Sequence, residues 1–170
     1  MDIWKYYAIT HKRHVICNPM DKDKIYKLLE LLNLEQRATV LDIGCGKGEI
    51  LIRLAELFNI SGIGVDISPY FLKDSRREKE GRVPNSDIKF MEMDGANYKN
   101  EENELFDLTM CIGASFAYGG FLNTINSLKK MTKPGGLLVL GEPYLLKELD
   151  PEYLKMSGIK KEDYATHRAT

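Results

Sequence analysis

Apolar residues follow two recurring patterns along the chain, short runs rich in β-branched residues and longer segments with helical spacing. The short runs are typical of buried strands and occupy residues 39–44, 62–67, 87–93, 105–113 and 137–142. The segments with helical spacing occupy residues 21–34, 50–58, 70–80 and 121–131. Because strands that alternate with helices are joined by right-handed crossovers, the pattern predicts an open α/β sheet of five parallel strands with helices on both faces.

Capping and turn-forming residues predict where several of these elements begin and end. Ser68 is expected to cap the third helix, with Pro69 as its first residue. Gly81 and Pro84 are expected to end the same helix. The run P-G-G at 134–136 should close the fourth helix ahead of the last strand.

The length of 170 residues fits a single domain with three parts. Residues 1–35 form an N-terminal segment with the first core helix, which we expect to act as a lid, and residues 36–144 form the core. Residues 145–170 predict a helical remnant, with short pieces at 150–156 and 160–167. No further β-rich run is expected after the last of the five strands.

Charge and composition exclude several classes of partner. The 24 basic and 25 acidic residues give a net charge of -1, so no overall field draws the chain to nucleic acid or to an anionic membrane. The longest aliphatic run is Leu137–Leu140, whereas a membrane-spanning helix needs about 20 apolar residues. Cys17, Cys45 and Cys111 are too widely spaced for a disulfide framework or a zinc site. We therefore expect no metal and a reduced, cytoplasmic setting.

A glycine-rich segment follows the first predicted strand, with the sequence V-L-D-I-G-C-G-K-G-E at residues 40–49. Its three glycines leave bare backbone amides at the start of a helix, where a ligand can approach closely. Glu49 occupies the position where the dinucleotide-binding fingerprint has its third glycine, and the spacing does not fit a phosphate-binding P-loop. Asp42, just before the first glycine, suits a ligand that carries a positive charge.

The D-x-G-x-G-x-G pattern that starts at Asp42 resembles motif one of the class I, Rossmann-like S-adenosylmethionine-dependent methyltransferases of the small-molecule type. The resemblance covers about residues 36 to 144 and includes the stretch L-K-K-M-T-K-P-G-G-L-L-V-L. It implies a Rossmann-like sheet of seven strands in which an antiparallel pair follows strand five. Because no further β-rich run exists here, we expect five strands, with that terminal pair missing.

The resemblance also implies the residues that contact the cofactor, S-adenosyl-L-methionine, and its product, S-adenosylhomocysteine. Asp66, at the end of the second strand, would accept hydrogen bonds from the ribose hydroxyls. Asp94 would bind the adenine amine, with Ile67 and Ala96 beside the ring. Taken singly, either acid is as readily a cap or turn residue. The complete expected set is Asp42, Gly44, Cys45, Gly46, Gly48, Asp66, Ile67, Asp94, Gly95, Ala96, Ile112 and Gly113.

The acceptor side is less well defined by the sequence. A sulfonium is already an activated methyl donor, so the protein must mainly orient the acceptor and exclude water, and a general base is needed only where a proton leaves. Tyr118 and Tyr144 are the best candidates for acceptor contacts, and Glu142 is a candidate base. His11 is a further candidate base, although a mixed basic segment such as H-K-R-H more often forms a solvated surface turn.

Two features narrow the choice of chemistry. The fourth strand ends in C-I-G-A-S and lacks the Asn/Asp-Pro-Pro-Tyr motif of methylases that act on planar amino groups. Cys111, on the same strand, is more readily a buried core cysteine than a nucleophile. Trp4, Tyr6 and Tyr7 could wall a pocket if the N-terminal segment folds over it.

Three functions therefore remain open. The favoured one is methyl transfer to a small-molecule acceptor, without a membrane or nucleic-acid partner. The second is a protein or fragment that binds S-adenosylmethionine without turnover, and the third is a nicotinamide-dependent oxidoreductase, which Asp42 and Glu49 disfavour. If the terminal strand pair is missing, the fifth strand is an exposed edge or is covered by another chain, as in a homo-oligomer.

Overall fold

The computed structural model describes residues 2–99, 104–145, 148–157 and 165–166. They form two compact units, Met1–Leu140 and Gly141–Thr170, each of which is considered by itself. The elements of the first unit are α1 (Ile3–Thr10), α2 (Lys22–Leu31), β1 (Thr39–Ile43), α3 (Glu49–Phe58), β2 (Ser61–Asp66), α4 (Pro69–Arg82), β3 (Ile88–Glu92), η1 (Gly95–Asn97), β4 (Phe106–Ile112), η2 (Ser115–Tyr118), α5 (Phe121–Lys129) and β5 (Thr132–Gly141). β5 runs one residue into the second unit, which also contains β6 (Tyr144–Leu145), α6 (Pro151–Ser157) and β7 (Ala165–Thr166).

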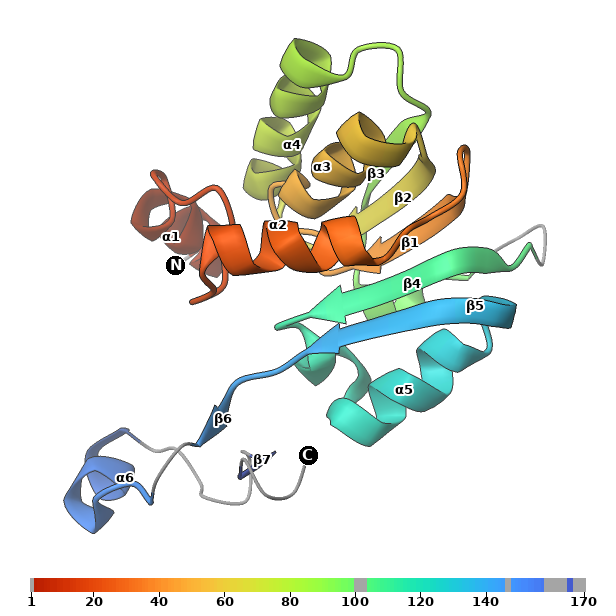
Figure 1. The fold of residues 1–170 in the computed structure, drawn as a ribbon. Coiled ribbons are helices and arrows are strands. Elements are labelled where there is room, and N and C mark those ends of the chain that lie inside the picture. The colour runs from red at the N-terminus through yellow and green to blue at the C-terminus, as the bar shows by residue number, and fades with distance from the viewer. Residues whose placement is uncertain (1, 100–103, 146–147, 158–164, 167–170) are drawn as a thin grey trace. The chain divides into compact units, whose positions relative to one another are not determined.

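The main sheet has five parallel strands in the order β3-β2-β1-β4-β5 (Figure 1). β1 lies at its centre, where Leu41 is in register with Ile63 of β2 on one side and Thr109 of β4 on the other. The chain moves outward from β1 in one direction to β3 and in the other direction from β4 to β5, so the strand order reverses between β1 and β4. Ligands of open α/β sheets bind beyond the carboxyl ends of the strands at such a point.

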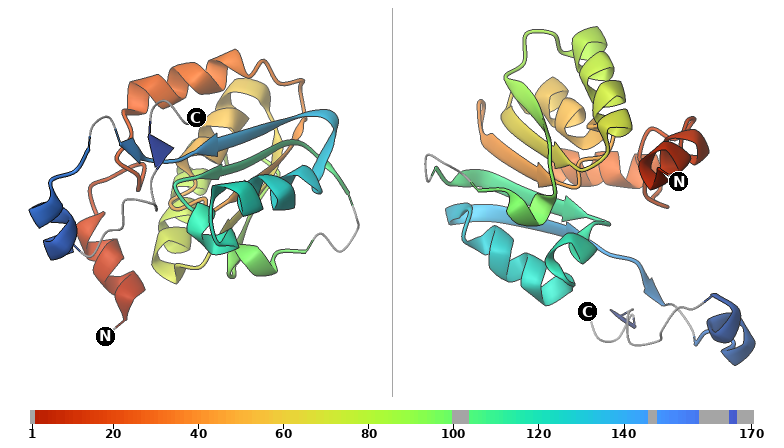
Figure 2. Two further views of the ribbon diagram at one scale, coloured as in Figure 1. Left: turned by 90° about the horizontal axis from the view of Figure 1, so that it is seen from below. Right: turned by 180° about the vertical axis from the view of Figure 1, so that it is seen from behind.

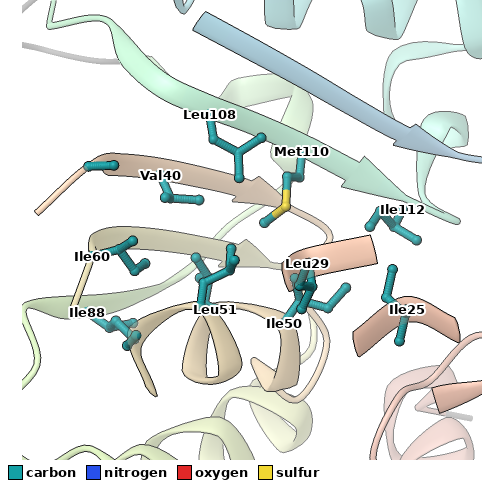
Figure 3. Packing of buried hydrophobic residues seen from close by; sticks show 13 residues of the cluster. Ile25, Leu29, Val40, Ile50, Leu51, Ile60, Ile88, Leu108, Met110 and Ile112 are labelled. Atoms are coloured by element: carbon teal, nitrogen blue, oxygen red, sulfur yellow. The ribbon is translucent and has the colours of Figure 1, made fainter. Parts of the chain in front are cut away.

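Helices cover both faces of this sheet, as the sequence predicts (Figure 1, Figure 2). On one face, α2 and α3 pack against alternate residues of the central strands, including Val40 and Leu108, around the fully buried Leu51 (Figure 3). On the other face, Leu41 of β1 packs with Leu128 of α5. Alternation along β1 therefore sends successive side chains into two separate cores.

Two predicted boundaries are wrong, and both involve glycine. Gly81 lies inside α4, which continues to Arg82, and the helix ends at Val83, just before Pro84. The space around Gly81 is open, so the only effect that disfavours glycine at this helical position is its low helix propensity. Ser68 does cap this helix, and its Oγ accepts a hydrogen bond from the Phe71 amide at 3.3 Å.

The run P-G-G at 134–136 lies within β5 rather than closing α5, so the strand begins five residues earlier than predicted, at Thr132. The Thr132 hydroxyl is 2.7 Å from that of Thr109 on β4, which ties this early part of the strand to the sheet. Proline is tolerated here because β5 is the edge strand and needs donors on one side only.

α5 begins at Phe121, as expected, but its apolar stripe is only partly buried. Leu128 is fully buried, together with the polar Thr124, whereas Phe121 is exposed and Leu122 is 72% exposed. The helical spacing therefore identified the helix correctly but overestimated how much of it faces the core.

In the second unit, α6 begins where Asp150 and Pro151 predict, and the Asp150 carboxylate accepts a hydrogen bond from the Glu152 amide at 2.7 Å. The expectation of no further β structure is wrong in detail, because the two-residue strands β6 and β7 pair in parallel as a small separate sheet. Of the helical piece predicted at 160–167, only Ala165 and Thr166 are described, and they form β7; the rest lies outside the described residues.

Within the described ranges, every helix is too short or too polar to cross a bilayer.

The core predicts a contrast between two leucines. Leu51→Ala should lower the free energy of unfolding by about 2–5 kcal/mol, because it leaves a cavity between α3 and the sheet. Leu31→Ala, at a position that is 72% exposed, should have an effect within about 0.5 kcal/mol. Urea unfolding followed by circular dichroism measures both, and equal losses would contradict this assignment of the core.

Candidate functional site

A cleft of about 410 Å³ opens beyond the carboxyl ends of β1, β2 and β4, a volume typical of small-molecule sites. Its walls come from the glycine loop after β1, the strand ends, η1, η2 and the segment before α2. The residues that line the cleft include Trp4, Tyr7, His11, Asn18, Asp42, Gly44, Cys45, Gly46, Lys47, Glu49, Asp66, Ile67, Phe71, Asp94, Gly95, Ile112, Gly113 and Phe116.

The glycine loop, residues 44–48, turns tightly from β1 into α3. Gly44 and Gly48 have φ angles of 75° and 73°, in the left-handed region that other residues rarely adopt. A Cβ on Gly44 would lie 2.4 Å from the Ala114 side chain, so the loop also passes close to the segment after β4. The Gly44 amide donates to the Val65 carbonyl at 2.8 Å, which fastens the loop to the end of β2.

Asp66 joins the glycine loop to the start of α4. Its Oδ2 accepts a hydrogen bond from the Gly46 amide at 2.8 Å, and its Oδ1 accepts one from the Ser68 amide at 2.8 Å. Burial raises the pKa of Asp66, and the amides of Ser68, Gly46 and Ile67 partly oppose that rise. A carboxylate has about four acceptor positions, so acceptor capacity remains for a hydroxyl donor of a ligand in the cleft.

Asp42 is a carboxylate that lacks a compensating partner. It is 2% exposed, lines the cleft, and makes no side-chain hydrogen bond within the part of the chain that the structure describes. Burial raises its pKa to about 7, and the nearby charge of Asp66 adds to the rise. A positively charged group in the cleft would therefore stabilise the ionised form of Asp42.

Asp94 lies at the start of η1, where its Oδ1 accepts a hydrogen bond from the Ala96 amide at 3.0 Å. The other carboxylate oxygen is available to an amine in the cleft. Ile67, which also lines the cleft, is 41% exposed and offers an apolar surface beside it. This combination fits a flat ring that carries an amino group.

The structure gathers most of the expected cofactor residues at this one cleft. Gly48 and Ala96 are the exceptions, since neither is among its lining residues. Gly48 shapes the turn instead, because a Cβ there would lie 2.6 Å from the Phe90 ring. The exposed Ala96 contributes its backbone amide to Asp94 rather than a surface to the cleft.

An N-terminal arm, residues 2–18, forms one wall. Trp4, Tyr7 and His11 line the cleft, whereas Tyr6 does not and is exposed. The end of the arm is attached to β4, because the Asn18 side-chain amide donates to the Ile112 carbonyl at 2.6 Å. The arm thus lines the cleft, and its role as a lid stays a prediction, whereas Lys12, Arg13 and His14 are exposed, as a solvated surface turn requires.

His11 occupies the C-cap of α1 and is half-buried. Its Nδ1 lies 3.1 Å from the Tyr7 carbonyl oxygen, and its ring is 6.2 Å from that of Phe71. A proton on Nδ1 would bond to that carbonyl and leave Nε2 as a proton acceptor. Its role as a base stays a prediction.

Of the other acceptor-side candidates, only Tyr118 belongs to the same unit as the cleft. The Tyr118 hydroxyl donates to the Gly95 carbonyl at 3.0 Å, and Tyr118 is not among the residues that line the cleft. Burial raises the pKa of Tyr118 to about 12. Tyr118 therefore supports η1 from behind. Glu142 and Tyr144 belong to the second unit, and their roles stay predictions.

Sequence reasoning missed Lys47, the residue between two glycines of the loop. Its Nζ donates to the carbonyl oxygens of His11 at 2.8 Å and His14 at 2.9 Å, so its charge is directed into the arm. Asp74 of α4 lies 3.5 Å from the same nitrogen. The one signal in the sequence for this role is a lysine two residues before an apolar helix, α3.

Glu49 is also explained by its neighbours. It is buried, forms an ion pair with Arg82 at 2.5 Å, and accepts a hydrogen bond from the Tyr26 hydroxyl. These partners bind the carboxylate at the first residue of α3, a position where a pyrophosphate would meet a like charge.

Metal chemistry finds no support among the described residues, which contain no group of three His, Cys, Asp or Glu side chains arranged to hold an ion. Cys17, Cys45 and Cys111 form no disulfide within the described residues. Cys111 is fully buried in the core between the sheet and α5, as expected from the sequence.

Comparison with known proteins supports one chemistry. A family model described as a methyltransferase domain matches residues 34–168. The Escherichia coli (strain K12) protein YjhP is 34% identical over 144 residues, which make up 85% of this chain and 57% of YjhP. The chain thus spans less than two thirds of the length of this curated relative.

Solved structures agree. A methyltransferase from Thiobacillus denitrificans, crystallised with S-adenosyl-L-homocysteine, is 34% identical with a TM-score of 0.88, over 98% of this chain and 67% of that one. One from Geobacter sulfurreducens with the same ligand is 28% identical with a TM-score of 0.86, over 95% and 65%. The crystal structure of YjhP has a TM-score of 0.88 at 30% identity, over 97% and 67%.

The shifted pKa of Asp42 predicts a pH dependence of stability. Between the ordinary value of 3.8 and about 7, the folded state keeps a proton that the unfolded chain has released, so raising the pH lowers the free energy of unfolding. Asp42→Asn should remove this contribution. Thermal unfolding from about pH 4 to pH 7 measures it against Asp87→Asn, an exposed control. A variant with the wild-type slope would contradict the assignment.

Proposed function

Because this chain belongs to the methyltransferase domain family, we propose that it binds S-adenosyl-L-methionine in the cleft and transfers the methyl group to a small-molecule acceptor. One observation carries the proposal, namely that Asp42 near the end of β1, Asp66 at the end of β2 and Asp94 just after β3 line one cleft with the glycine loop. Three acids at the strand ends suit a ligand with a cationic part, hydroxyls and an amine, and disfavour a phosphate.

The described residues fit that cofactor in three ways. The unpartnered carboxylate of Asp42 suits the positive end of the ligand, and the remaining acceptor capacity of Asp66 suits the ribose hydroxyls. The free oxygen of Asp94 suits the adenine amine. The Lys47 ammonium, the one basic group within the glycine loop, is directed into the arm, so it does not oppose a cationic ligand.

When bound, the cofactor supplies a methyl group that is already activated by the sulfonium. The protein residues have the remaining work of orienting the acceptor and excluding water. Trp4, Tyr7 and Phe116 place aromatic surface along the cleft for both purposes. If the acceptor must lose a proton, Nε2 of His11 is the group we propose to accept it.

Two relatives support the cofactor assignment, because the Thiobacillus denitrificans and Geobacter sulfurreducens proteins were crystallised with S-adenosyl-L-homocysteine. A small-molecule acceptor is the finer part of the proposal and rests on the resemblance in the motifs and on the size of the cleft. Binding and turnover are separate claims, so each needs its own measurement.

We further propose a homo-oligomer formed through β5, since its outer edge pairs with no strand of the main sheet. Cys17, Cys45 and Cys111 form no disulfide within the described residues, which favours a reduced compartment. We propose a cytoplasmic location for that reason.

The cofactor assignment predicts a loss of affinity in one variant. Asp66→Ala should weaken binding of S-adenosylhomocysteine by at least about tenfold, because it removes charge-assisted hydrogen bonds to the ligand. Asp87→Ala, an exposed acid ahead of β3, should leave the affinity unchanged. Calorimetric titration gives both constants, and circular dichroism checks that each variant folds.

Two outcomes would overturn the cofactor proposal. One is an unchanged affinity in the folded Asp66→Ala protein. The other is tight binding of NAD(H) by the wild type without any response to S-adenosylhomocysteine, which would favour an oxidoreductase.

A further inference from the structure

Lys47 places a positive charge at a nearly closed position inside the molecule. Its side chain is 8% exposed, although it belongs to the loop that borders the cleft. The ammonium nitrogen is 2.8 Å from the His11 carbonyl oxygen, 2.9 Å from that of His14 and 3.4 Å from that of Lys12. An ammonium has three donors, so these backbone acceptors and Asp74 satisfy it completely.

The acceptors are themselves significant, because they belong to the turn where α1 ends. Carbonyl groups at a helix C-terminus have no partner within the helix and carry a partial negative charge. Lys47 therefore binds the C-cap carbonyl of α1, that of His11 36 residues away, together with two carbonyls of the turn that follows the helix. Asp74, 29% exposed, balances the charge from α4.

Other attachments of the arm lie nearer its ends. At the start of α1, the Tyr70 hydroxyl donates to Oδ2 of Asp2 at 2.7 Å, but this contact is exposed to solvent. At the far end, Asn18 is bonded to the Ile112 carbonyl. Lys47 is the attachment between them, and it holds the turn that begins at His11.

We propose that Lys47 is a positioning residue that fixes the N-terminal arm against the glycine loop, and so places Trp4, Tyr7 and His11 along the cleft. The contact itself is independent of any ligand. Its role in the reaction rests on the proposed function, since the same loop borders the cofactor site. Lys47 lies between Gly46 and Gly48 of the glycine loop, so a ligand that orders the loop also orders the arm. By reciprocity, an ordered arm increases the affinity for the ligand.

The sequence provides a reporter and a cleavage site for the test. Trp4 is the only tryptophan, so tryptophan fluorescence, excited selectively over the nine tyrosines, reports on the arm alone. Lys12 and Arg13 are exposed residues in the turn that Lys47 holds, so trypsin can cut there once the turn opens. Arg37, in an exposed turn before β1, is an internal reference for cutting elsewhere.

The experiment compares Lys47→Met with Lys73→Met, in which an exposed lysine of α4 is removed as the matched control. Loss of the buried charge-assisted bonds should speed cutting after Lys12 and Arg13 by about tenfold relative to Arg37. Quenching of Trp4 by acrylamide should rise about twofold. Lys73→Met should match the wild type in both, and Tyr70→Phe should change them little.

Cutting and quenching at wild-type levels in a folded Lys47→Met protein would overturn the proposal. If Lys47→Met does not fold, Lys47→Gln, which keeps a polar but shorter and neutral side chain, is expected to show the same local changes. Both readouts are taken without ligand, so they stand apart from the cofactor assignment.

A titration with S-adenosylhomocysteine then tests the coupling. It should lower Trp4 quenching in the wild type, and the affinity should fall in Lys47→Met while Lys73→Met is unaffected. Equal affinity in Lys47→Met and the wild type would overturn the coupling, whereas failure of the wild type to bind would overturn the proposed function and leave the ligand-free result intact.

Discussion

The site depends above all on the two hydrogen bonds that the Asp66 carboxylate accepts from the Gly46 and Ser68 amides. They join the loop after β1 to the turn after β2, two segments that parallel strands bring side by side. With the loop held in this way, Lys47 extends toward the arm while Asp42 stays at the edge of the cleft. One half-buried carboxylate therefore fixes both the floor of the cleft and the attachment of its wall.

Much of the fold could be predicted because the information was local. The apolar run of β1 and the Ser68-Pro69 cap act on their own residues, and both predictions are confirmed. The predictions at Gly81 and the P-G-G run are wrong because these residues act as stops only in local structure. Packing and strand pairing override that preference, so α4 includes Gly81 and β5 includes the P-G-G run.

The acids of the site could be found from the sequence, since topology alone brings the ends of parallel strands together. Lys47 and Asn18 could not, because they act on backbone carbonyl oxygens, which every residue has and no sequence pattern marks. The prediction that Tyr118 contacts the acceptor is not supported, for a related reason. Its position after β4 was predicted correctly, but its hydroxyl turns to the Gly95 carbonyl behind the cleft.

The isolated carboxylate of Asp42 makes the cleft a site of exchange between a proton and a cation. Near neutrality the group is partly protonated, so a positively charged ligand that settles beside it must displace that proton. Occupancy and acidity are then thermodynamically linked. As the surrounding solution becomes more acidic, protons compete with the ligand for the same carboxylate. The fraction of protein with bound ligand then falls without any movement of the fold.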